Sequence, residues 1–110
     1  IFSLAYPEKS SNWTNRFQMF ATENMWTFIL LDSYNGRLWQ VQYSTQDLDN
    51  LFCIPINKYE LVENNERCIF SIQPLTSMYQ YYLINDNTGD MWKFQWSTKG
   101  DDYRWIERFR

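Results

Sequence analysis

The sequence predicts an all-β fold, built as two tandem copies of an antiparallel four-strand meander that pack as a sandwich or a small barrel. Apolar and polar side chains alternate along most of the chain, and glycine-containing turns interrupt the alternating runs. The pattern then recurs 53 positions later without a gap. Alternation with a period of two is typical of half-buried strands, and a fixed long period indicates a structural repeat. We therefore expect one domain over residues 1–110, with internal repeats at 16–56 and 69–109.

The first repeat follows an N-terminal arm, residues 1–15, whose short apolar piece is either an edge strand or a partly ordered segment. Its strands are expected at 16–21, on both sides of a hairpin turn within 25–44, and at 51–56. Gly36 supplies the positive φ that the tight hairpin turn needs. Pro55 cannot donate to a strand ladder, so the last strand is an edge or ends there.

The parity of the first hairpin separates two faces. If Asp32 lies opposite Arg37, one face carries only apolar side chains, because β side chains alternate. We expect this face to be the core: Trp26, Phe28, Leu30, Trp39, Val41 and Tyr43. The opposite face is mixed and would point outward, with Thr27, Ile29, Gln40 and Gln42.

The second repeat follows a polar linker at 57–66 and has the same design, with a hairpin over 78–97 that turns at Gly89. Its predicted core face consists of Tyr79, Tyr81, Leu83, Trp92, Phe94 and Trp96. Nine identities join 17–56 to 70–109, where chance would give about two or three. They are Phe17/Phe70, Met25/Met78, Leu30/Leu83, Gly36/Gly89, Trp39/Trp92, Gln42/Gln95, Ser44/Ser97, Thr45/Thr98 and Asp49/Asp102.

Composition argues against several classes of partner. The net charge is −3, so neither a nucleic acid nor an anionic membrane is expected, since both require a basic footprint. No apolar run approaches the roughly 20 residues of a membrane-spanning helix. Localisation stays open.

The chemistry-bearing residues favour a protein that is not an enzyme. Histidine is absent, which removes the commonest general base and metal ligand, and the three glycines lie in separate turns instead of a phosphate loop. Acidic pairs stand in two loops, but their spacing matches no complete ligand set, so solvated turns are the simpler interpretation. These are Asp47 with Asp49 and Asp101 with Asp102. We predict no catalytic residue, no metal site and no cofactor.

The run Leu-Leu-Asp-x-x-x-Gly-Arg-x-Trp-Gln-Val-Gln at 30–42 resembles a recurrent motif of small bacterial repeat proteins of unassigned function. Its core, Asp32, Gly36 and Trp39, is similar to the blade hairpin of pyrroloquinoline-quinone-type propellers, although the second repeat has Asn85 in place of aspartate. Two repeats cannot close a propeller, which needs at least about four blades. The resemblance therefore implies no quinone site and no enzyme activity.

The function expected from these features is a noncatalytic interaction module that binds a protein partner or a second copy of itself. The candidate surface is the mixed face of the second hairpin, formed by Gln80, Tyr82, Lys93 and Gln95. A related version on the first hairpin would use Thr27, Gln40 and Gln42. A structural cover, either the arm or the linker, is the alternative occupant of that surface. A carbohydrate-binding module using exposed aromatic rings is the alternative function, and an enzyme using carboxylates alone is a third.

Two further expectations concern single side chains. Cys53 and Cys68 are expected to be buried free thiols, with a cross-strand disulfide as the alternative. Arg104, Arg108 and Arg110 lie on one face of the last strand, where charge would keep an exposed edge soluble.

Overall fold

The computed structural model describes residues 16–43, 51–57, 60–62 and 69–110, and in this part of the chain all regular structure is strand apart from one 3-10 turn. The strands form two antiparallel sheets, in the orders β1-β2-β3-β4 and β5-β6-β7-β8. Within each sheet, every strand thus pairs with its neighbour in the chain. The predicted pair of four-strand meanders is confirmed. The N-terminal arm lies outside the described residues.

The strand bounds repeat along the chain at the predicted shift of 53 residues, except that the third strand of the second sheet begins one residue late, at Met91. The first sheet comprises β1 (Phe17–Ala21), β2 (Thr27–Asp32), β3 (Arg37–Gln42) and β4 (Phe52–Pro55). The second sheet comprises β5 (Phe70–Pro74), β6 (Gln80–Asn85), β7 (Met91–Gln95) and β8 (Trp105–Arg108), with the 3-10 turn η3 (Asp101–Tyr103) before β8. Pairing repeats as well: Phe28 lies opposite Val41, and Tyr81 lies opposite Phe94.

Both central hairpins turn in the same way. Gly36 and Gly89 each have φ of 80°, a left-handed conformation that glycine adopts without steric cost. The turns open on a side-chain oxygen that accepts a backbone N–H two residues later. Asp32 Oδ1 accepts from Tyr34 at 3.1 Å, and Asn85 Oδ1 accepts from Asn87 at 2.9 Å. Aspartate and asparagine serve equally here because both supply this acceptor.

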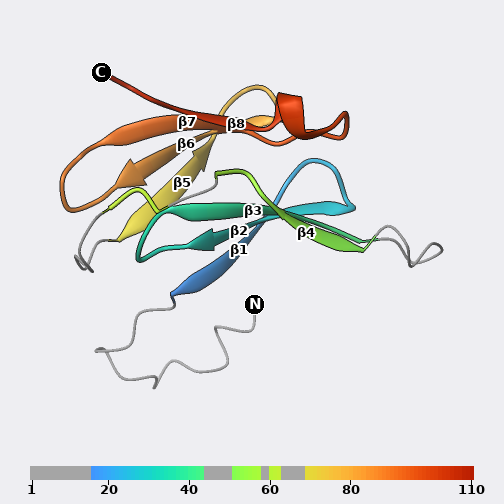
Figure 1. Cartoon of the computed structure of the whole chain (residues 1–110), viewed down its shortest axis with the longest axis horizontal. Helices are drawn as coiled ribbons and strands as arrows, with labels where there is room; N and C mark the ends of the chain where they lie inside the picture. The colour runs from blue at the N-terminus through green and yellow to red at the C-terminus, as the bar shows by residue number, and fades with distance from the viewer. Residues whose placement is uncertain (1–15, 44–50, 58–59, 63–68) are drawn as a thin grey trace.

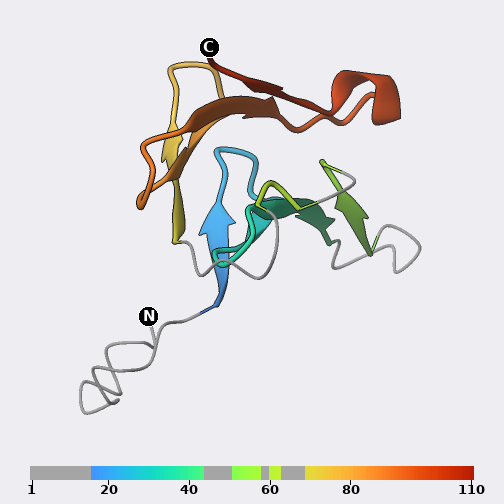
Figure 2. The ribbon, with the colours of Figure 1, turned by 60° about the vertical axis from the view of Figure 1, so that its left-hand side comes forward.

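The two sheets stack as layers, with the second sheet above the first in Figure 1, and the turned view separates them again (Figure 2). One apolar cluster lies between them and takes side chains from both layers. The first sheet and the residue after it contribute Ile29, Leu31, Leu38 and Ile56. The second contributes Phe70, Tyr81, Leu83, Trp92, Phe94 and Trp96. Leu61 and Val62 of the linker pack against this core.

The predicted core face is right for the second sheet, except that Tyr79 at its end is exposed, and wrong for the first. In the first sheet the mixed face, with Ile29 and Gln40, points into the core. The more apolar face points outward. The reason is that the sheets pack through unlike faces: the mixed face of the first repeat meets the apolar face of the second.

The hairpin turn of the first sheet holds the two layers together. Ser33 O accepts the N–H of Phe70 at 2.8 Å. A Cβ atom built on Gly36 would lie 3.0 Å from the Phe70 ring and 3.0 Å from Leu61. Glycine therefore serves this turn twice, through its positive φ and through its missing side chain.

Candidate functional site

The mixed face of the second hairpin lies outward, as predicted. Together with the residues of β5 and β8 that point to the same side, it forms the outer surface of the second sheet, here called the amide face. Gln80 Nε2 donates to Gln95 Oε1 at 2.9 Å, and Gln95 Nε2 donates to Tyr103 O at 2.9 Å. Tyr82 meets the ring of Phe109 edge-on at 5.6 Å. The amide face consists of Ser71, Gln73, Gln80, Tyr82, Ile84, Met91, Lys93, Gln95, Trp105 and Glu107.

The three candidates from the first hairpin do not form a surface. Thr27 and Gln40 are fully buried between the sheets, and Gln42 is half-buried on the same side. The prediction that these residues point outward is wrong. They occupy the positions equivalent to Gln80, Lys93 and Gln95, but the second sheet covers them.

Gln40 instead joins the two layers. Its Nε2 donates to Ser97 O at 2.9 Å, while its Oε1 accepts the N–H of Ser97 at 3.1 Å. The same oxygen accepts Arg104 Nε at 2.8 Å. Arg104 is therefore no member of an exposed edge: its side chain is only 8% exposed, and it also pairs with Asp101. A buried amide is tolerated because its hydrogen-bonding groups are satisfied.

The largest unexpected feature is the outer surface of the first sheet, here called the aromatic face. It carries the side chains that the sequence predicts as core, and they are open to solvent to different degrees. Phe17 is 55% exposed and Met19 is 56% exposed. The aromatic face consists of Phe17, Met19, Ala21, Trp26, Phe28, Leu30, Trp39, Val41, Tyr43, Cys53 and Pro55.

The rings of the aromatic face pack against one another as the buried rings of the second sheet do. Phe17 and Trp39 lie 6.4 Å apart at 46°, and their equivalents Phe70 and Trp92 lie 5.8 Å apart at 49°. A second pair, Trp26 with Tyr43 at 5.3 Å, corresponds to Tyr79 with Trp96 at 4.7 Å. The Phe17–Trp39 pair thus keeps the arrangement of its core equivalent, whereas the rings of Trp26 and Tyr43, at 70°, are more steeply inclined than those of Tyr79 and Trp96, at 48°.

A charged group closes one end of the aromatic face. Arg16 Nε and Nη2 donate to the two carboxylate oxygens of Asp32, each at 2.9 Å. This hydrogen-bonded pairing raises the pKa of Arg16. The guanidinium also lies over the rings of Phe17 at 5.3 Å and Tyr34 at 5.1 Å. Asp32, at the end of this face, is therefore occupied by an internal partner.

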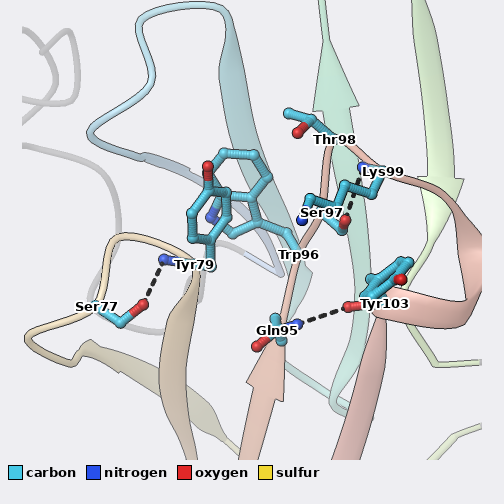
Figure 3. Close-up of a pocket in the computed structure, with 8 residues that line it drawn as sticks. All are labelled: Ser77, Tyr79, Gln95, Trp96, Ser97, Thr98, Lys99 and Tyr103. Carbon is cyan, nitrogen blue, oxygen red and sulfur yellow. Dashed lines mark hydrogen bonds between the residues drawn. The ribbon is translucent and has the colours of Figure 1, made fainter.

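A hollow of about 230 Å³ opens beside the second sheet, next to η3 (Figure 3). Trp96 lies at its base and is fully buried, with its indole N–H donated to Met78 O at 2.9 Å. Tyr79 and Tyr103 flank the opening and are 38% and 52% exposed. Lys99 Nζ lies 5.7 Å from the Tyr103 ring. The hollow therefore offers two partly exposed rings, several hydroxyl groups and the side-chain amide of Gln95.

A second hollow, of about 390 Å³, lies between the end of β1 and β5. Phe20, Ile72 and Pro74 make most of its wall apolar, and the ring of Tyr81 reaches it from the core. Burial raises the pKa of Tyr81, and the nearby Glu23 carboxylate raises it further. The phenol therefore loses its proton only at a higher pH than an ordinary tyrosine does.

Among the described residues, no group of three or more histidine, cysteine or carboxylate side chains is placed to hold a metal ion. The same part of the chain contains no helix long and apolar enough to cross a membrane. Cys53 is a free thiol and is exposed, so the expectation of burial is wrong for it, while Cys68 lies outside the described residues.

Compared with family models, curated proteins and solved structures, the chain matches none significantly. The resemblance of residues 30–42 to small bacterial repeat proteins stays a prediction. Function is therefore argued from the geometry of the two outer faces and the hollow.

Sequence reasoning missed the aromatic face as a surface and Gln40 as a junction residue. Alternation shows that a strand has two unlike faces, and the more apolar face is ordinarily the buried one. The repeat itself contained the missing signal. Two copies that follow one another without inversion pack through unlike faces, so one apolar face must be left uncovered by its neighbour.

Proposed function

We propose that this protein is a noncatalytic interaction module that binds another protein through the aromatic face. One observation carries the proposal: positions whose equivalents form the core of the second sheet are exposed in the first. Phe70 is 1% exposed, while the equivalent Phe17 is 55% exposed. Contiguous apolar patches of this kind are rare on monomeric proteins and mark interaction sites.

The composition of the aromatic face suits a protein partner. Interface cores are enriched in aromatic residues, methionine and arginine, and are surrounded by a polar rim. The aromatic face contains Trp39, Met19 and Phe17, and it is bordered by Arg37, whose guanidinium lies 5.1 Å from the Trp39 ring centre. Its rings already pack against one another, so binding would immobilise few free side chains, which limits the entropic cost of association.

A carbohydrate is the second candidate ligand, and the hollow of Figure 3 favours it. Sugars stack on aromatic rings and hydrogen-bond to amides and hydroxyls at their edges. Tyr79 and Tyr103 supply partly exposed rings, and Ser77 and Gln95 supply polar groups. This site lies apart from the aromatic face, so the two functions are separable by mutation.

Two double variants test the proposal reciprocally. Phe17→Glu with Met19→Glu places charge on the aromatic face, and Thr98→Glu with Tyr103→Glu places the same charge at the hollow. All four side chains are exposed, so both variants should keep the fold, which circular dichroism and thermal melting check. Each variant serves as the control for the other.

The experiment compares affinity capture by the wild-type chain and both variants, followed by calorimetry with each purified captured protein. We expect a partner whose affinity falls at least about tenfold on the aromatic-face variant and stays unchanged on the hollow variant. A glycan array run in parallel addresses the alternative. Glycan binding lost only in the hollow variant, with no protein bound through the aromatic face, would overturn the proposal.

A further inference from the structure

We infer that the partner of the aromatic face is the amide face of a second copy of this chain, so that copies join head to tail. The inference rests on the proposed function, because it names the partner of the same surface. Its argument is the interface already present inside the chain, between the first and the second sheet.

The packing inside the chain uses two unlike surfaces. The first sheet presents its Ile29 and Leu38 side, and the second presents its Phe70 and Trp92 side. Translated by one repeat, these two sides are the amide face of the second sheet and the aromatic face of the first. Each chain therefore carries both halves of one interface: the aromatic half on the outer surface of the first sheet and the amide half on the outer surface of the second.

The aromatic half is already shaped for this contact. Phe17 and Trp39 keep nearly the tilt that Phe70 and Trp92 have in the core, at 46° and 49°. In the core, that ring pair receives the hairpin turn of the neighbouring sheet, with Gly36 under Phe70. A docked copy would place its own hairpin turn against Phe17.

The amide half shows the matching space. A Cβ atom at Gly36 would meet Phe70 and Leu61, but at the equivalent Gly89 nothing among the described residues lies within 4 Å. Phe17, the equivalent of Phe70, is 55% exposed. Both sides of the glycine-to-phenylalanine contact are thus open at the outer surfaces. Inside the chain, the N–H of Phe70 donates a hydrogen bond to Ser33 O. In the joined copies, the N–H of Phe17 would donate the equivalent hydrogen bond to the carbonyl of Asp86 in the second copy.

The two junctions differ at several positions, and one of them is the position of Gln40. Gln40 receives both backbone groups of Ser97 inside the chain, whereas its equivalent on the amide face is the half-buried Lys93. An ammonium group donates but cannot accept, so Lys93 cannot form the donor-and-acceptor pair of hydrogen bonds that Gln40 forms. The hydrogen bonds that Gln40 forms inside the chain are therefore not reproduced by Lys93.

Because the two halves lie on different surfaces, the contact is heterologous. Such contacts close into rings when the rotation per copy permits, and otherwise form open chains. Closed rings of four-stranded sheets typically hold about four to eight sheets, which corresponds to about two to four copies here.

The test uses one blocked variant for each half of the contact. Phe17→Glu with Met19→Glu blocks the aromatic face, and Tyr82→Glu with Met91→Glu blocks the amide face at the equivalents of Ile29 and Leu38. Thr98→Glu with Tyr103→Glu is the charge-matched control on neither face. Light scattering and sedimentation measure the mass of each from about 1 μM to about 1 mM, the range of weak protein interfaces. Circular dichroism checks each fold, and the serine versions replace any glutamate variant that does not fold.

We expect the wild type and the control to associate with rising concentration and each blocked variant to remain a single chain. An equimolar mixture of the two blocked variants should form a species of two chains, because one intact aromatic face meets one intact amide face.

Three results would overturn the inference. If the amide-blocked variant alone still forms pairs, the contact joins two aromatic faces. A wild type that stays monomeric over the whole range rules out self-association. In that case, capture of a different protein through the aromatic face would leave the proposed function standing. A large loss of thermal stability on blocking the aromatic face, without any change in mass, shows that this face is covered inside the chain.

Discussion

Phe17 and Phe70 are the same residue at the same position of two copies of one sheet, yet the first is 55% exposed and the second 1%. Their strands, turns and cross-strand neighbours agree, and each ring packs on the equivalent tryptophan. Local sequence therefore determines how each sheet forms, but it does not determine which face of the sheet is buried. Burial depends on which neighbour the fold brings to each face, and the two sheets have different neighbours.

The phenylalanine pair gives the largest expected difference. Phe70→Ala should cost about 3–5 kcal/mol of unfolding free energy, as for other large aromatic residues removed from a core. Phe17→Ala should cost less than about 1 kcal/mol at low protein concentration, because its ring is already half in water. Urea denaturation followed by tryptophan fluorescence measures both. Equal losses would show that the aromatic face is packed inside the folded chain.

The tryptophans offer a second version of that comparison. The sequence alone predicts similar losses of about 3–5 kcal/mol for Trp39→Ala and Trp92→Ala, whereas the structure keeps that value for Trp92 and lowers it for the half-buried Trp39. Denaturation monitored by circular dichroism, which does not depend on either indole, should place the Trp92 variant clearly below the Trp39 variant. The reverse order would contradict the assignment of the faces.

The next effect concerns the glutamine that joins the layers. Gln40→Leu should cost about 2–3 kcal/mol, because the buried backbone groups of Ser97 and the guanidinium of Arg104 lose their partner. Lys93→Leu, at the equivalent outward position, should change the free energy of unfolding by less than about 0.5 kcal/mol. Thermal melting of both variants at low concentration checks the difference. Similar values would mean that Gln40 has no special role between the sheets.

The two turn glycines should differ by less. Gly89→Ala introduces only the strain of a left-handed alanine, about 1–2 kcal/mol, since no described atom lies within 4 Å of the added Cβ. Gly36→Ala adds contacts of 3.0 Å with Phe70 and Leu61 and should cost about 1 kcal/mol more. Chemical denaturation of the two variants in parallel makes the measurement. A larger loss at Gly89 would be inconsistent with an open amide face.

The smallest effect is expected at Cys53, which is exposed where its equivalent Ile106 packs against the core. Cys53→Ser should change stability by less than about 0.5 kcal/mol. Its thiol should react with iodoacetamide in the native protein. Partial burial raises the pKa of Cys53, so the thiolate and hence the reaction should appear at higher pH than for a free thiol. Peptide mass spectrometry shows the modified site, and protection at low protein concentration would contradict the exposed face.

Much of the fold could be predicted because its determinants are local. Alternation located the strands, and the Asp32 and Asn85 turns fixed which residues face each other. The orientation of the first sheet could not be predicted in this way, because it depends on contacts between residues far apart in the chain. Gln40 looks like a surface residue until Ser97, 57 residues later, supplies its hydrogen bonds.

The same distinction between local and distant contacts applies to the candidate surfaces. Gln80, Tyr82, Lys93 and Gln95 were predicted to lie together because they belong to one hairpin, and parity alone places them on one side. The aromatic face is exposed, by contrast, because no sheet among the described residues packs against it. Apolar side chains are ordinarily buried, so the alternation in the first repeat predicted that this face forms the core.

The meander order also bears on how the chain folds. Within each sheet every strand pairs with the next one along the sequence, so both ladders can form by closing short loops. Short loops lose little entropy and close quickly, whereas contacts between distant residues must wait for the chain to be brought together. The pairing of Gln40 with Ser97 is such a distant contact, and it completes only when two preformed sheets dock. Substitutions at Gln40 should accordingly speed unfolding more than they slow folding, which places the junction on the native side of the folding barrier.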